Sequence, residues 1–233
     1  DISGDIDVDG TTNLDVVDID GAVDMASTLQ VDGAITGSST INGVGISSNI
    51  SNFTSSILIS NDAGTGTLSG ANYNTGLGWE VFDDLTTGDE NTSAGYLSST
   101  KLTTGGGNSA FGYQALLTNT TGNHNTAIGR SALEANTTAA ANTAIGFAAL
   151  GVNTTGTQNV AVGFQALDAN TTGGENVAVG TNALSANTTA GNNVAIGKDA
   201  LAANTIGNTN VAIGTDAMTT NVAADRNVAV GEQ

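Results

Sequence analysis

Residues 159–175 read N-V-A-V-G-F-Q-A-L-D-A-N-T-T-G-G-E, and this 17-residue unit recurs along most of the chain. We number its positions 1 to 17 from the first Asn. Position 1 is Asn in ten successive units, at Asn74, Asn91, Asn108, Asn125, Asn142, Asn159, Asn176, Asn193, Asn210 and Asn227. Position 5 is Gly in every one of them, at Gly78, Gly95, Gly112, Gly129, Gly146, Gly163, Gly180, Gly197, Gly214 and Gly231. A fixed period of this kind indicates stacked structural repeats.

The unit favours short strands and turns. A Gly in every unit, alternating apolar residues and many β-branched residues argue against helices. Alternation places Val177 and Val179 on one face of a strand and Ala178 on the other. We expect the branched residues to line the interior, and the row of Ala residues to face a neighbouring subunit. The Ala-Leu pair at positions 8 and 9 should form a second, shorter strand, and Asn-Thr-Thr-Gly at positions 12 to 15 should close the unit as a turn.

These features predict an all-β protein whose main part is a parallel β-solenoid of 17-residue coils. Each coil should advance about 4.8 Å, which gives a rod of roughly 45 Å. Identical side chains would then stack, so we expect a structural ladder along the Asn and Gly columns from Asn108 and Gly112 onward. Gly163 should be required by its backbone conformation, so valine there should be destabilising, whereas a change at Gln165 should do almost nothing.

The first part of the chain follows a different pattern. Residues 1–50 hold short alternating segments that each end in Gly, which predicts a β-rich fibrous shaft in which several chains wrap one axis. Residues 51–73 are interpreted as a junction, and residues 74–233 as the solenoid. The chain begins without an initiator Met and stops seven residues into a unit, so we expect the natural polypeptide to extend beyond both ends.

Composition excludes several classes of function. Glycine occurs 32 times, cysteine is absent, and the formal net charge is −18, which disfavours nucleic-acid binding. No apolar run approaches the length that crosses a bilayer, so no membrane insertion is expected. The sequence contains no nucleophile-base pair, phosphate loop or metal cluster, which predicts a non-enzymatic protein with no cofactor and no metal.

Four features invite a chemical interpretation. The segment Asp5–Gly10 resembles the start of a calcium loop, but Val16 stands where a closing Glu is needed, so a strand with one acidic face is favoured. His124, the only His, is interpreted as a solvated turn residue. The Asn-Thr-Thr triplets match glycosylation sequons, although their phase with the repeat explains them without glycans. Regular Thr rows could also bind ice.

Large side chains gather where the repeat begins. Tyr73, Trp79 and Phe82 could stack on a sugar or cover the first coil. A covering role is favoured, because a stack of repeats needs a cap.

The N-x-A-[IV]-G core resembles the head repeats of trimeric autotransporter adhesins, and the fuller unit with A-L and N-T-T-G is similar to repeats in tail-fibre proteins of tailed phages. The resemblance covers residues 108–233 well and residues 74–107 weakly. It implies a homotrimeric fibre, a virion appendage or other extracellular protein, that attaches to a host surface glycan or protein. The alternatives are a bacterial trimeric surface adhesin, and an ice-binding or purely structural filament.

Overall fold

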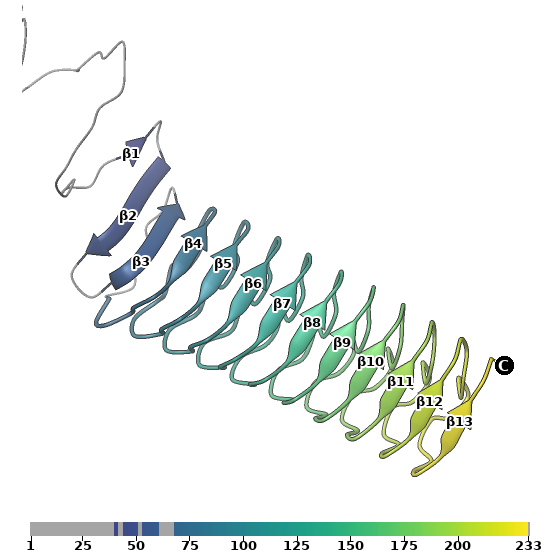
Figure 1. Cartoon of the computed structure of the whole chain (residues 1–233). Coiled ribbons are helices and arrows are strands. Elements are labelled where there is room, and N and C mark those ends of the chain that lie inside the picture. Colours follow the sequence, from purple (N-terminus) through teal and green to yellow (C-terminus); the bar gives the residue numbers. More distant parts are fainter. Residues whose placement is uncertain (1–39, 42–43, 51–52, 61–67, 233) are drawn as a thin grey trace, which may run out of the picture. The chain divides into compact units, whose positions relative to one another are not determined.

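The computed structural model describes residues 40–41, 44–50, 53–60 and 68–232. The candidate calcium loop and most of the predicted shaft lie outside these residues. Within them, a 13-stranded sheet runs strictly in chain order, from β1 to β13 (Figure 1). The first three strands are β1 (Thr40–Ile41), β2 (Val44–Ile50) and β3 (Phe53–Ser60), and they form two antiparallel pairs.

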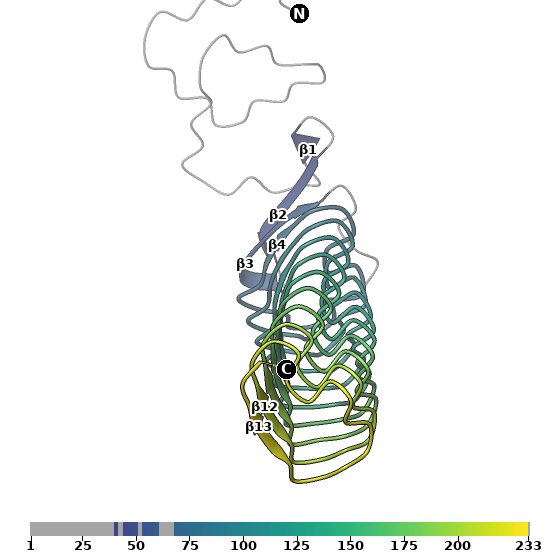
Figure 2. The ribbon, with the colours of Figure 1, turned by 90° about the vertical axis from the view of Figure 1, so that its right-hand side faces the viewer.

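From β3 onward every pairing is parallel. Ten three-residue strands follow, one per coil: β4 (Thr75–Leu77), β5 (Thr92–Ala94), β6 (Ser109–Phe111), β7 (Thr126–Ile128), β8 (Thr143–Ile145), β9 (Val160–Val162), β10 (Val177–Val179), β11 (Val194–Ile196), β12 (Val211–Ile213) and β13 (Val228–Val230). Partners sit 17 residues apart, as Val177 with Val194, so the period sets the register. The predicted parallel β-solenoid of 17-residue coils is confirmed, and its coils lie one behind another in Figure 2.

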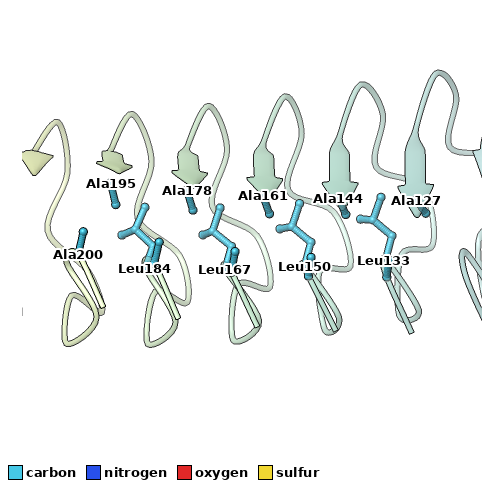
Figure 3. Packing of buried hydrophobic residues seen from close by; sticks show 14 of the residues in the cluster. Ala127, Leu133, Ala144, Leu150, Ala161, Leu167, Ala178, Leu184, Ala195 and Ala200 are labelled. Carbon is cyan, nitrogen blue, oxygen red and sulfur yellow. The ribbon is translucent and has the colours of Figure 1, made fainter. Parts of the chain in front are cut away.

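The prediction of which strand face lines the interior was wrong. Ala178 and its equivalents at position 3 from Ala110 to Ala212 are fully buried, whereas Ile128 and Ile196 at position 4 are 40% and 39% exposed. Figure 3 shows the strand alanines pointing at the leucines of the opposite side of the coil. The coil is so narrow that one Leu side chain fills the space, and only a methyl group fits opposite it. The Ala row therefore cannot contact a neighbouring subunit.

The Ala-Leu pair forms turns, and the expected second strand is absent from the described coils. Gln165 and Leu167, at positions 7 and 9, have φ of 51° and 53°. These two left-handed residues, separated by one residue, turn the chain where a strand was expected. Their N–H groups still bond neighbouring coils, Gln165 to the Phe147 carbonyl at 2.9 Å and Leu167 to the Ala183 carbonyl at 3.0 Å. Valine at Gln165 would be strained by this left-handed backbone, which argues against the expectation that a substitution there does almost nothing.

The position-5 glycines behave as expected. Gly163 has φ of +141°, and a Cβ added to it would lie 2.5 Å from the Gly180 carbonyl oxygen of the next coil. Both the backbone conformation and the close approach of the next coil therefore require Gly.

The predicted covering role is not found for the three aromatic residues. Phe82 is buried at position 9 of its coil, in the place that Leu takes later. Tyr73 and Trp79 are 63% and 47% exposed. Strand β3 instead lies against the N-terminal side of the first coil. Its Ile57 pairs with Thr75, and its Leu58 is buried.

Candidate functional site

The predicted Asn column forms a buried hydrogen-bonded ladder. Asn159 Nδ2 donates to Asn142 Oδ1 at 3.2 Å and to the Gly173 carbonyl at 2.9 Å. Asn159 Oδ1 in turn accepts the backbone N–H and the Nδ2 of Asn176, at 3.0 and 3.1 Å. Each amide thus joins its own coil to the coils on both sides. The same bonds recur along the column, for example at Asn108, Asn125, Asn193 and Asn210. The ladder is structural.

A second Asn ladder, which the sequence analysis treated only as a turn, runs along position 12. Asn170 Nδ2 donates to Asn153 Oδ1 and to the Gly173 carbonyl, both at 2.9 Å. These side chains are fully buried. The amide nitrogen that a glycan would modify is therefore inside the coil and fully bonded, which agrees with interpreting the sequons as part of the repeat. The recurrence of N-T-T every 17 residues in the sequence could have predicted this second ladder.

Two columns of threonine follow this ladder. At position 13 the hydroxyl donates to the carbonyl of the equivalent residue in the next coil, as Thr154 does to Thr171 at 3.0 Å. At position 14 the side chains are exposed, as at Thr121, Thr155 and Thr172. One row of threonines, rather than two, therefore faces solvent.

The outer face of the sheet is apolar along position 4 of the repeat. Positions 2 and 4 point outward; position 2 is Thr or Ser in the first five coils and Val in the last five, and position 4 is mostly Val and Ile. Ile128, Ile145, Ile196 and Ile213 are between 37% and 40% exposed. We call this surface the outer sheet face. It runs along all ten solenoid strands without interruption.

Position 6, next to the outer sheet face, carries a stack of four aromatic rings and one guanidinium in five successive coils. Tyr96 and Tyr113 are stacked with centroids 5.4 Å apart, and Phe147 and Phe164 with centroids 5.2 Å apart. Arg130 lies between the two pairs, with Cζ 5.4 Å from the Tyr113 centroid and 5.6 Å from the Phe147 centroid. We call these five residues the position-6 stack. Reading position 6 down the repeat could have revealed it.

A shallow depression of about 350 Å³ lies where Gly151 leaves space between Glu134 and Asp168. Burial raises the pKa of Asp168, and backbone N–H groups at Asp168 and Ala169 partly oppose this effect. Among the described residues no group of three or more His, Cys, Asp or Glu side chains could hold a metal ion. His124 is exposed in a turn, with φ of 57°. Nor does the described part of the chain contain a helix that is long and apolar enough to cross a membrane.

Comparison with models of known protein families, with curated proteins and with solved structures finds no significant match to this chain.

Proposed function

We propose that this chain is the rod segment of an extracellular, non-enzymatic, homotrimeric fibre, a phage tail fibre or comparable virion appendage that presents a multivalent attachment surface to its host. The single observation that carries the proposal is the outer sheet face, which continues along ten stacked coils. The number of subunits, three, is proposed from the resemblance to fibre and adhesin repeats.

The size and composition of the outer sheet face favour self-association. Ten coils of about 4.8 Å and strands about 10 Å long give a face of about 450 Å². The largest apolar patch on a typical soluble monomer is about 300–600 Å² and is often functional, so a face of this size is suited to contact with a partner. Three copies arranged around one axis would cover three such faces at once. The contact is thus assigned to positions 2 and 4, in place of the buried Ala row.

A rigid rod of three chains suits attachment by avidity. It holds three copies of each surface site at fixed distances, so weak sites act together. The net charge of −18 per chain keeps such rods soluble and apart from one another.

Light scattering of the intact protein tests the proposal, because three chains of 22.9 kDa would give about 69 kDa. Ile145→Glu, on the outer sheet face, should release monomers, since three buried carboxylates would meet at the axis. Thr155→Glu, on an exposed turn, is the matched control and should leave the mass unchanged. A wild-type mass near 22.9 kDa would refute the trimer.

Two alternatives have different tests. A bacterial surface adhesin would use the same rod, and an anchor domain in the adjoining gene sequence would separate it from a tail fibre. Ice binding is supported by the exposed threonine column at position 14, including Thr121, Thr155 and Thr172. It has weaker support than the fibre because only that one row is free. Thermal hysteresis of the purified protein would favour ice binding.

A further inference from the structure

We infer that the position-6 stack is a binding site for a carboxylate-bearing sugar of a surface glycan, with Arg130 as the residue that holds the carboxylate. The inference rests on the proposed attachment function and names the ligand class.

Arg130 is exposed and lies between two rings. Its Cζ is 5.4 Å from the Tyr113 centroid and 5.6 Å from the Phe147 centroid, within the range of cation–π contacts. The N–H edge is therefore the part of the guanidinium left for a ligand. This edge forms a rigid fork that matches the two oxygens of a carboxylate.

Arg130 also lacks an acidic partner in the described part of the chain. Of the other three basic residues, Lys101 pairs with Asp84 and Lys198 with Asp199, each at 3.1 Å, and Arg226 has no ion pair within the described residues either. Arg130 differs from Arg226 in lying between two aromatic rings. Its geometry is organised for an anion that comes from outside the chain.

The rest of the stack suits a sugar that carries this anion. Because the rings face one another along the rod, their edges face solvent, and aromatic edges are electropositive. Tyr96 and Tyr113 add phenol hydroxyl groups on one side of Arg130, and Phe147 and Phe164 add electropositive C–H edges on the other. A sugar acid offers a carboxylate to the guanidinium, and its hydroxyl oxygens can accept from the phenol groups and meet the ring edges.

An acidic peptide is the less favoured ligand. Peptides commonly bind by extending a sheet edge or by filling a groove. Strands β5 to β9, which precede the five residues of the stack, are hydrogen-bonded on both sides and leave no free edge. An extended glycan lying along the rod needs neither feature.

Calorimetric titration of the intact protein with oligogalacturonate tests the site. The methyl ester of the same oligosaccharide is the matched ligand control, because it keeps the sugar and removes the charge. Arg130→Gln should weaken oligogalacturonate binding about tenfold or more, since the bidentate pair is lost. Arg130→Lys should retain only part of the affinity, because the lysine ammonium group neither stacks on the rings nor donates two parallel hydrogen bonds to a carboxylate. Arg226→Gln is the control for charge alone and should bind as wild type does.

Several results would overturn the inference. The inference fails if oligogalacturonate does not bind, or if its methyl ester binds equally well. It also fails if Arg226→Gln loses as much affinity as Arg130→Gln, or if the protein binds an acidic peptide but no oligogalacturonate. A changed sedimentation coefficient for Arg130→Gln would instead assign the stack to a contact between copies. A wild-type monomer that still binds through Arg130 would refute the fibre and keep the site, so the two failures are distinguishable.

Discussion

Replacing Asn159 with alanine is the sharpest test of what holds the coils together. The substitution removes four side-chain hydrogen bonds, to Asn142 Oδ1, to the Gly173 carbonyl and from the two nitrogens of Asn176. It leaves the Asn176 backbone N–H without its acceptor in a site that is fully buried. Water cannot replace the lost groups without opening the coil.

The magnitude follows from this count. A typical hydrogen bond contributes about 0.5–1.5 kcal/mol, so four such bonds should lower the free energy of unfolding by about 2–6 kcal/mol. We expect a value in the upper half of that range, because buried groups left unpaired add their own desolvation cost.

Denaturant unfolding followed by circular dichroism measures this change. All proteins should be compared at one chain concentration, since association would shift the apparent stability. Thr172→Ala is the matched control, because Thr172 is an exposed residue only two positions from the Asn170 of the second ladder. It should change the stability by less than about 0.5 kcal/mol. A loss below about 1 kcal/mol for Asn159→Ala would refute the reasoning that the ladder stabilises the solenoid.

The remaining predictions concern single positions. Gly163→Val should cost about 3 kcal/mol or more, because the new side chain meets the Gly180 carbonyl at a positive φ; an unchanged melting temperature would show that the site is permissive. Ala141→Gly should stabilise by about 0.5–1 kcal/mol, since Ala141 has φ of 59°, whereas Ala140→Gly at an ordinary φ should destabilise; equal effects would argue against backbone strain. Asp168→Asn should raise the melting temperature at neutral pH. Burial raises the pKa of that carboxyl in the folded state, so its ionisation lowers stability as the pH rises, and the advantage of the variant should vanish near about pH 3. A gain that is independent of pH would contradict this assignment.

The position-6 stack was missed in the sequence, although its residues recur at the 17-residue period. The sequence analysis considered only Tyr73, Trp79 and Phe82, because these large residues cluster near the start of the repeat. Phe82 is buried in the first coil, and the other two are exposed. Tyr113 and Arg130 lie 17 positions apart, so the predicted stacking of coils already places them side by side, and the structure adds that the guanidinium lies over the ring at 5.4 Å.

The sequence by itself determined the period, the parallel stacking and the main ladder. Identical residues at a constant interval can stack in only one register, so the recurrence of Asn159 and Gly163 every 17 residues was sufficient. Only the tertiary structure decided which side of each strand is inside. Alternation places Ala178 on the opposite face from Val177 and Val179 but does not determine which face is buried. That choice depends on the width of the coil, which is set by the left-handed Ala-Leu turn opposite the strand. Because the buried Leu fills the interior, only alanine fits beside it, and the branched residues are left on the surface where a partner can cover them.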